Sequence, residues 1–253
     1  MRTYSLAGVD VPRIGLGTNR LTDDHEGVAF VREAVAVGVR HIDTAHLYAD
    51  GASERAVGEA LDGAHEEVVA ATKGGYRRGE GRPRVLRAQI EQSLRSLRTD
   101  VIALYYLHRV DPETPLEESL GAIKEYVDRG AILRVGISAV GVEEIERARR
   151  VLPIAAVQNE YNLSDRRHDE VVDHCAEQGI AFVPYYPLRG GDGPALAEVA
   201  ARHGVTPDQV KLAWLLQRSP AVLPIPGTRS IAHLRENLGA LSLELGHEDL
   251  AAL

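Results

Sequence analysis

The chain has 253 residues, of which 44% are hydrophobic and 26% are charged, and its formal net charge at pH 7 is −8. This charge argues against a general nucleic-acid partner, since phosphate backbones are bound by basic surfaces. Membrane insertion and secretion are not expected either, because no apolar run approaches ~20 residues and the N-terminus lacks a signal-peptide core. One cysteine, Cys175, agrees with a reducing compartment, and we expect a cytoplasmic protein.

Short apolar runs alternate with amphipathic stretches along the chain, after an expected hairpin at residues 4–11. The runs predict buried parallel strands at 14–18, 39–43, 68–73, 101–107, 132–138, 154–159, 180–185 and 222–226. The amphipathic stretches predict helices at 24–37, 53–62, 83–97, 116–129, 142–151, 164–178, 207–218 and 230–240, with an additional short helix at 194–203. Eight strand-then-helix units predict an α/β fold, a single (β/α)8 TIM barrel over residues 1–253, with the hairpin covering the barrel bottom.

Polar residues close several of these apolar runs, where such barrels place their chemistry. Asp43, Lys73 and His108 end three adjacent predicted strands, and Tyr48 lies in the loop after the first of them. A lysine at the end of a buried strand needs a partner, and Asp43 is the candidate. We expect the Lys73 cation to lower the pKa of the Tyr48 phenol, which would make it a better proton donor near neutral pH. His108 would orient a carbonyl oxygen on which negative charge develops.

Each of these side chains also has a purely structural interpretation, as a buried ion pair, a loop tyrosine or a buried histidine. Two other kinds of site are conceivable. His41, Asp43 and His46 suggest a metal site, but the spacing argues against it because His46 lies in the loop and no further ligand completes the set. Lys73 could form a Schiff base, but pairing with Asp43 keeps its amine protonated.

Eight short sequence motifs are spread over nearly the whole chain. They are GLGT at 15–18, HIDTAHLY at 41–48, ATKGG at 71–75, LHRVDP at 107–112, VGIS at 135–138, VQNEYNL at 157–163, VPYYPL at 183–188 and IPGTRSIAHLREN at 225–237. In this order they resemble the aldo-keto reductase family, in its compact bacterial form with a short C-terminal segment. The resemblance implies reduction of an aldehyde or ketone to an alcohol by hydride transfer from NADPH, with NADH the less favoured cofactor. It makes Tyr48 the proton donor, His108 the substrate-orienting group, and Lys73 with Asp43 the supporting ion pair.

The resemblance also implies a set of cofactor-binding positions. They are Gly17, Thr18, Ser138, Gln158, Tyr185, Leu188, Gly190, Gly191, Gly227, Thr228, Arg229, Glu236 and Asn237. Ser138 and Gln158 match the positions that hold the nicotinamide carboxamide, and Tyr185 matches the ring that stacks on the nicotinamide. Leu188 to Gly191 form a glycine-containing loop whose backbone N–H groups can cradle the pyrophosphate. Thr228 and Arg229 match the 2′-phosphate site, and Glu236 and Asn237 lie near the adenine.

The substrate is a small carbonyl compound that the sequence does not name. Candidate wall residues are Tyr76, Tyr161 and Tyr186, while Trp214 is expected to pack between helices. The short loop after His108 and the short C-terminal segment predict an open, shallow pocket. A non-catalytic protein that binds NADPH as a sensor is the alternative within the same fold. The oligomeric state stays open, with a monomer compatible with the sequence.

Overall fold

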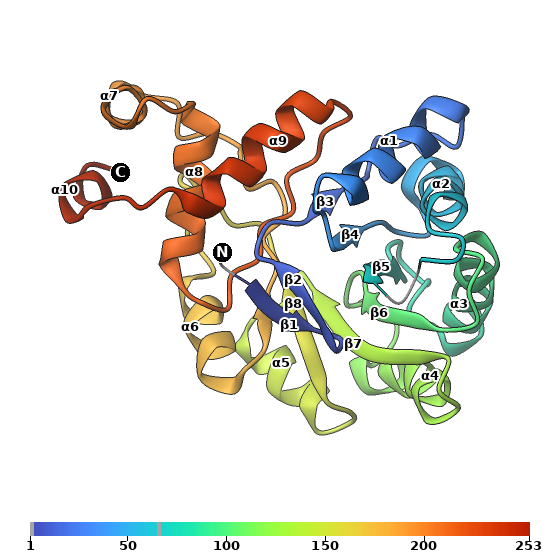
Figure 1. The fold of residues 1–253 in the computed structure, drawn as a ribbon. Coiled ribbons are helices and arrows are strands. Elements are labelled where there is room, and N and C mark those ends of the chain that lie inside the picture. The colour runs from blue at the N-terminus through green and yellow to red at the C-terminus, as the bar shows by residue number, and fades with distance from the viewer. Residues whose placement is uncertain (1–2, 65–66) are drawn as a thin grey trace.

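The computed structural model describes residues 3–64 and 67–253. Its main sheet is parallel and curls into a barrel whose strands follow one another in chain order from β3 to β9 (Figure 1). The strands are β3 (Leu16–Gly17), β4 (His41–Asp43), β5 (Val69–Gly74), β6 (Ile102–Leu107), β7 (Ile132–Ser138), β8 (Ile154–Gln158) and β9 (Ala181–Phe182). The parallel strands bring their carboxyl ends to the same end of the barrel, which fixes where their terminal polar residues meet.

Helices surround the barrel on the outside (Figure 1). They are α1 (His25–Ala36), α2 (Ala52–Ala60), α3 (Pro83–Ser96), α4 (Leu116–Asp128), α5 (Val142–Arg149), α6 (Asp169–Gln178), α8 (Pro207–Arg218) and α9 (Ile231–Gly239). Two more, α7 (Pro194–His203) and α10 (His247–Ala252), contact each other beside the barrel, and short 3-10 turns occupy Tyr48–Gly51 (η1) and Ala240–Ser242 (η3). The additional helix predicted at 194–203 is thus present as α7.

The eighth predicted strand, at 222–226, is not a regular strand in the structure. Pro224 and Pro226 have no backbone N–H, so this segment cannot form an uninterrupted ladder. It still closes the barrel through isolated backbone hydrogen bonds to the segment at 15–17 and to β9. These run from Gly15 N to Pro224 O at 2.9 Å, from Gly17 N to Pro226 O at 3.1 Å, and from Leu223 N to Phe182 O at 2.8 Å. The seventh strand is also shorter than predicted, since Pro184 follows β9 closely.

The N-terminal hairpin covers one end of the barrel, as predicted. Its strands β1 (Thr3–Leu6) and β2 (Val9–Pro12) are antiparallel and lie across the barrel opening in Figure 1. Leu6 and Val11 are buried and join a cluster of inward-facing barrel side chains that includes Leu104. A larger hydrophobic cluster fills the layer between the sheet and the helices. Since the hairpin closes this end, the open end is the one formed by the strand carboxyl termini.

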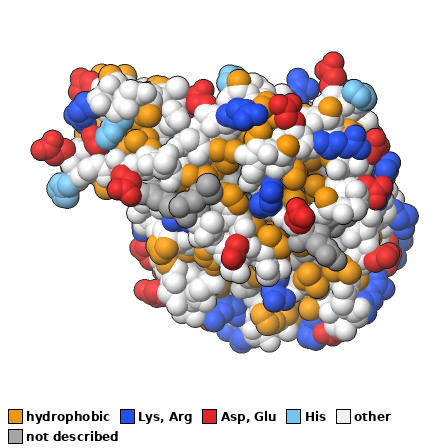
Figure 2. Space-filling model, in the orientation of Figure 1, with side chains coloured by type: hydrophobic (Ala, Val, Ile, Leu, Met, Phe, Trp, Pro, Cys, Tyr) orange, Lys and Arg blue, Asp and Glu red, His pale blue; other side chains and the backbone are white. Residues whose placement is uncertain are grey.

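The hairpin face of the molecule carries acidic and basic side chains that are interspersed rather than gathered by sign (Figure 2). Within residues 3–64 and 67–253, no helix combines the length and the apolarity needed to cross a bilayer.

Candidate active site

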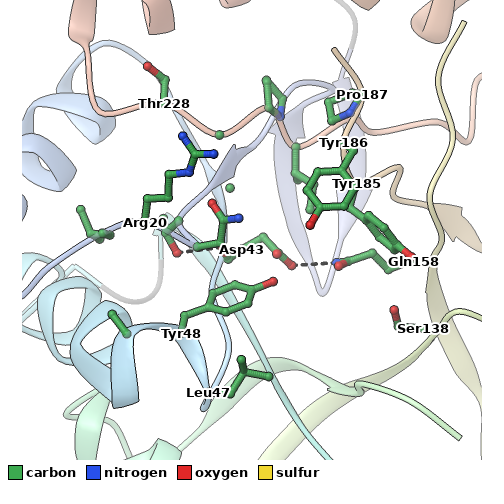
Figure 3. Close-up of a pocket in the computed structure, with 18 of the residues that line it drawn as sticks. Arg20, Asp43, Leu47, Tyr48, Ser138, Gln158, Tyr185, Tyr186, Pro187 and Thr228 are labelled. Atoms are coloured by element: carbon green, nitrogen blue, oxygen red, sulfur yellow. Dashed lines mark hydrogen bonds between the residues drawn. The ribbon is translucent and has the colours of Figure 1, made fainter. Parts of the chain in front are cut away.

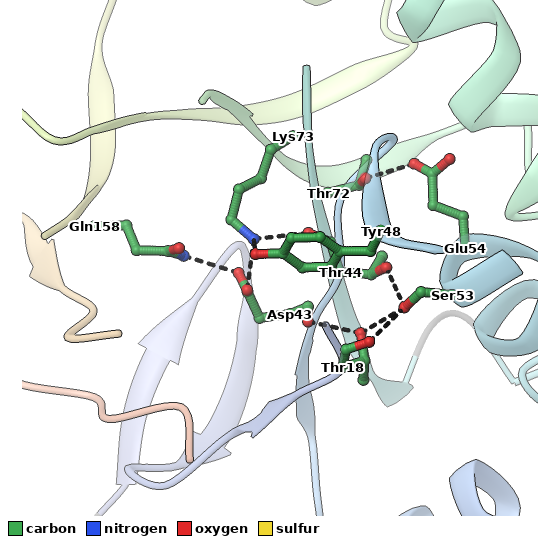
Figure 4. Close-up of polar contacts among 9 residues, drawn as sticks. All are labelled: Thr18, Asp43, Thr44, Tyr48, Ser53, Glu54, Thr72, Lys73 and Gln158. Carbon is green, nitrogen blue, oxygen red and sulfur yellow. Dashed lines mark hydrogen bonds and ion pairs between the residues drawn. The ribbon is translucent and has the colours of Figure 1, made fainter. Parts of the chain in front are cut away.

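Lys73 is the centre of a polar network at the carboxyl ends of β4 and β5 (Figure 4). Its side chain is fully buried, and its ammonium donates to Asp43 Oδ1 at 2.5 Å, to the Thr44 carbonyl at 2.7 Å and to the Tyr48 hydroxyl at 3.4 Å. The other carboxylate oxygen of Asp43 accepts from Gln158 Nε2 at 2.8 Å. All three ammonium protons therefore have acceptors, and the predicted Lys73–Asp43 pair is present.

Burial and charge act against each other on the two titrating groups that meet here. Burial alone would lower the pKa of Lys73, but Asp43 and the Tyr48 phenol outweigh it and raise that pKa, so the ammonium stays charged. Burial also raises the pKa of Tyr48, and the Lys73 cation offsets this only in part. The predicted net lowering of the Tyr48 pKa is therefore wrong, because the sequence names the nearby cation but not the depth of the phenol. Tyr48 remains protonated at neutral pH, which is the form that can give a proton away.

The His108 ring lies close to the Tyr48 ring on the cavity. Their ring centres are 6.1 Å apart and their planes meet at 82°. The imidazole follows β6 and is buried, and this burial, aided by the Lys73 and Arg109 cations, lowers its pKa to about 2. A neutral imidazole carries one N–H donor, which suits a hydrogen bond to a carbonyl oxygen.

The turn that carries Tyr48 is held in an unusual backbone conformation. Ala49 and Asp50 have φ angles of 48° and 51°, in the left-handed region that disfavours side chains by about 1–2 kcal/mol per residue. A group of buried hydroxyls fastens the start of α2 beneath this turn, with Ser53 Oγ donating to the Thr18 carbonyl at 2.9 Å and lying 2.7 Å from Thr44 Oγ1 (Figure 4). The turn thereby keeps the Tyr48 ring beside Lys73, whose Nζ lies 4.9 Å from the ring centre.

A cavity of about 770 Å³ opens at the carboxyl end of the strands. Its lining includes Tyr48 at one end and Thr228 at the other (Figure 3), with His108 close to Tyr48 and Arg229 next to Thr228 in the chain. Figure 3 shows Arg20 extending between Tyr48 and Thr228, with Tyr185, Tyr186 and Pro187 on the opposite wall. The cavity is therefore long enough to bring several separate loops to one ligand.

A family model described as the aldo/keto reductase family matches residues 13–193 and 192–253. The chain belongs to the aldo/keto reductase family. Membership places it among oxidoreductases and confirms the resemblance of its motifs to this family.

Individual proteins that are similar to this aldo/keto reductase support the same family. Escherichia coli pyridoxine 4-dehydrogenase is 38% identical over 99% of this chain and 96% of its own length. A thermostable aldo-keto reductase solved with the inhibitor epalrestat is 34% identical, with a TM-score of 0.91 over 99% of this chain and 98% of that one. An enzyme from Klebsiella pneumoniae solved with NADP and acetate is 31% identical, with a TM-score of 0.88 over 99% and 93%. These neighbours confirm the TIM barrel.

Most of the predicted cofactor positions lie on the cavity of this aldo/keto reductase. Those lining it are Gly17, Thr18, Ser138, Gln158, Tyr185, Leu188, Gly227, Thr228 and Arg229. Ser138 and Gln158 end the neighbouring strands β7 and β8, so both polar groups reach the catalytic end (Figure 3). A hydroxyl, an amide and a flat ring at one end, with a guanidinium at the other, fit an elongated dinucleotide.

Four predicted cofactor positions do not line the cavity. Gly190 and Gly191 have φ angles of 64° and 73° and face inward, since a Cβ on Gly190 would lie 2.6 Å from Ser164 Oγ. Glu236 accepts from Thr206 Oγ1 at 2.6 Å, and Asn237 is buried in α9. These residues shape the loop and the helix behind the cavity in this structure, and any contact of theirs with a cofactor stays a prediction.

Two of the three predicted wall tyrosines line the cavity. Tyr76 and Tyr186 do so from exposed positions, with 43% and 45% of their surface accessible. Tyr161 does not, so its prediction as a wall residue is wrong. It is fully buried in the outer layer, where its ring stacks on Trp214 at 5.8 Å and its hydroxyl donates to Asp169 at 2.5 Å. Trp214 packs between elements as expected.

The sequence reasoning missed two arginines that line the cavity, Arg20 and Arg109. Arg20 lies two residues after GLGT at 15–18, and Arg109 lies inside LHRVDP at 107–112, so both are at or near segments that resemble the family. Their positions next to strand ends were a usable signal.

The two histidines considered as metal ligands have different surroundings. Among the described residues, no group of three His, Cys, Asp or Glu side chains is placed to hold a metal ion. His41 is buried with neither ring nitrogen hydrogen-bonded, and burial lowers its pKa to about 4. His46 instead lies 4.0 Å from Glu54.

Proposed function

We propose that this aldo/keto reductase reduces the carbonyl group of a small aldehyde or ketone to an alcohol, with NADPH as cofactor and Tyr48 as proton donor. The observation that carries the proposal is the convergence of Tyr48, Lys73, Asp43 and His108 at one end of a single cavity. A buried ammonium–carboxylate pair alone would be structural, but a protonated phenol beside it and a neutral imidazole opposite it form an acid site.

NADPH, when bound, supplies the hydride. Ser138 and Gln158 would hold its carboxamide, and Tyr185 would stack on the nicotinamide. At the far end Thr228 and Arg229 would bind the 2′-phosphate, since a guanidinium fork matches phosphate oxygens. Two observations support this assignment. The Klebsiella pneumoniae neighbour was solved with NADP, and the Arg229 side chain forms no ion pair with another described residue.

Side chains of the protein supply the proton that the substrate oxygen receives. As the substrate carbon accepts hydride, negative charge develops on the oxygen, where the neutral His108 N–H stabilises it. Tyr48 transfers its hydroxyl proton to that oxygen and becomes a phenolate beside the Lys73 ammonium, 3.4 Å away. Asp43 holds the ammonium in place, and solvent returns a proton to Tyr48 after the alcohol leaves.

Pyridoxal is the first aldehyde to test, because the Escherichia coli relative is a pyridoxine 4-dehydrogenase. Because Tyr76 and Tyr186 are exposed, the pocket leaves room for other aldehydes. A panel of aromatic and aliphatic aldehydes should therefore be tested together with pyridoxal.

The proposal is tested by NADPH oxidation with this panel, using Tyr48→Phe as the variant and Tyr126→Phe as the matched control. Tyr126 lies on α4 away from the cavity and donates to Glu91. We expect Tyr48→Phe to lower kcat by roughly a hundredfold to ten-thousandfold while the NADPH dissociation constant changes by less than about threefold. Tyr126→Phe should keep kcat. Undiminished turnover in Tyr48→Phe would remove it as the proton donor. Tight NADPH binding without turnover of any aldehyde would favour the non-catalytic sensor.

A further inference from the structure

Arg109 is a cation beside His108 on the cavity, and it has no acidic partner among residues 3–64 and 67–253. It directly follows His108, and its backbone N–H donates to the Gly75 carbonyl at 3.1 Å, which fixes the residue against the end of β5. Among the described residues, its guanidinium forms no hydrogen bond or ion pair, and it lies over the ring of Tyr76, 5.6 Å from the ring centre. A guanidinium has five donors, so most of its hydrogen-bonding capacity is unused.

The three carboxylates of the loops after β5 and β6 are engaged elsewhere. Asp111 accepts from the backbone N–H groups of Gly79, Gly81 and Glu113 and from the Thr114 hydroxyl, at 3.0–3.1 Å. The other two carboxylates, Glu113 and Glu80, bind other arginines or backbone N–H groups. Glu113 binds Arg78 and Arg82, and Glu80 accepts from the backbone N–H groups of Tyr76 and Arg77. These three carboxylates therefore bind other groups, and Arg109 lines the cavity without a carboxylate partner.

The cofactor does not account for Arg109 either. Two other arginines line the cavity: Arg229 follows Thr228, where the cofactor phosphates belong in the proposed function, and Arg20 extends between Tyr48 and Thr228. Arg189 already has a partner, since it binds Glu160 at 2.8 Å. Arg109 is grouped instead with His108 and Tyr76, whose rings are 4.8 Å apart, on the side where the substrate oxygen would lie.

We propose that Arg109 binds an anionic group of the carbonyl substrate, a carboxylate or a phosphate, while the exposed Tyr76 ring contacts the part of the substrate that joins this group to the carbonyl. The substrate class is therefore an anionic aldehyde or ketone. This inference rests on the proposed function. A planar guanidinium binds a carboxylate or phosphate through two parallel hydrogen bonds, so it selects for such a group and orients it.

The first test compares matched aldehydes that differ in one substituent. 4-Carboxybenzaldehyde and 4-methylbenzaldehyde form one pair, and pyridoxal 5′-phosphate and pyridoxal form the other, which separates carboxylate from phosphate recognition. In each pair the ratio of kcat/KM values, anionic over neutral, is measured for the wild type and for Arg109→Met. We expect Arg109→Met to lower the ratio roughly tenfold to a hundredfold for at least one pair, because a charge-assisted hydrogen bond is lost.

Two further variants make this result specific. Arg109→Lys keeps the charge and loses the planar fork, so its ratio should lie between those of the wild type and Arg109→Met. Arg84→Met removes an exposed arginine of α3 that forms no ion pair with a described residue, and it should leave both ratios unchanged. Unchanged ratios in Arg109→Met would overturn the proposal, as would a weakened NADPH affinity with unchanged ratios, which would assign Arg109 to the cofactor.

The second test does not need turnover. Calorimetric titration of benzoate into the protein, with and without NADP+, measures anion binding at the same place. We expect Arg109→Met to weaken benzoate binding roughly tenfold or more, and Arg84→Met to leave it unchanged. If no aldehyde is reduced, the proposed function fails while this titration still decides the role of Arg109. Equal benzoate affinity in the wild type and Arg109→Met, or no binding to the wild type, would overturn the inference.

Discussion

The two ends of the cavity differ in how far the protein satisfies its own charges. At the catalytic end, the Lys73 ammonium has three acceptors and both oxygens of the Asp43 carboxylate accept hydrogen bonds, all from buried groups. Arg229 at the far end and Arg20 between the two ends are exposed, and neither side chain forms a hydrogen bond or ion pair with another described residue, although the charge of Arg229 acts on Asp24. Folding completes the first end, whereas a ligand must complete the second.

The difference corresponds to two functions, proton donation at one end and phosphate binding at the other. A proton donor must be oriented before the substrate arrives, so its partners are built into strand ends that the barrel fixes. A site for phosphate needs cations that keep their donors free until the ligand binds. Arg109 combines both properties, since it is adjacent to the fixed His108 yet has an unused guanidinium, and this combination is why we assign it to the substrate rather than to the catalytic group.

Removing the Lys73 ammonium should have the most severe consequences. Lys73→Met leaves the Asp43 carboxylate buried without its counter-ion, which costs about 3–5 kcal/mol of folding stability. It also removes the cation beside Tyr48, so we expect kcat to fall by at least about a hundredfold. Urea unfolding and steady-state kinetics measure the two effects. Lys124→Met is the control, since Lys124 is partly exposed on α4 and its only ion pair within the described part of the chain is with Asp128. A kcat close to that of the wild type would contradict the account.

At the unsatisfied end, the expected effect is on binding rather than chemistry. Arg229→Gln should raise the NADPH dissociation constant roughly tenfold to a hundredfold and change kcat at saturating NADPH by less than about threefold. The affinity difference should shrink as salt is added, because exposed charges are screened. Arg235→Gln, on the exposed side of α9, is the matched control. A large loss of kcat with unchanged NADPH affinity would show that the two ends are not separate in function.

The smallest expected effect concerns pH and sharpens the description of the catalytic end. Tyr48 donates in its protonated form, which is present below its raised pKa and lost only as pH rises through a value above the ordinary 10. His108 is neutral at any pH above about 2. We therefore expect kcat for reduction at saturating NADPH to stay nearly level between about pH 6 and 9. An inflection near pH 6.5 that disappears in His108→Gln would show that the imidazole titrates and is not neutral throughout.

The positions of Asp43, Lys73 and His108 were predictable because each ends an apolar run, and parallel strands bring such ends together. The segment at 222–226 was recognised as buried, but its hydrogen bonding depends on two prolines and on both neighbouring strands. Tyr161 was misplaced because a residue past a strand end can turn toward the cavity or toward the helix layer, and the sequence pattern does not distinguish the two.

Electrostatics was the least predictable property. The sequence showed that Lys73 stands near Tyr48, but the sign of the change in the Tyr48 pKa depends on burial, which only the folded chain defines. The unpaired state of Arg109 likewise depends on which carboxylates other groups engage. Asp111 and Glu113 are close to Arg109 in sequence, yet Asp111 accepts from Gly79 and Gly81 and Glu113 binds Arg78, all in the turn after β5.

The central claim, that Tyr48 and Lys73 act as one proton-donating unit, is tested most directly by a double-mutant cycle on kcat. Tyr48→Phe, Lys73→Met and the double variant are compared with the wild type at saturating NADPH, with fold confirmed by circular dichroism. If the two residues work together, the double variant should be no slower than Tyr48→Phe alone, within about threefold. If instead the two losses multiply, Lys73 acts on the reaction independently of Tyr48, and the account of the acid site is contradicted.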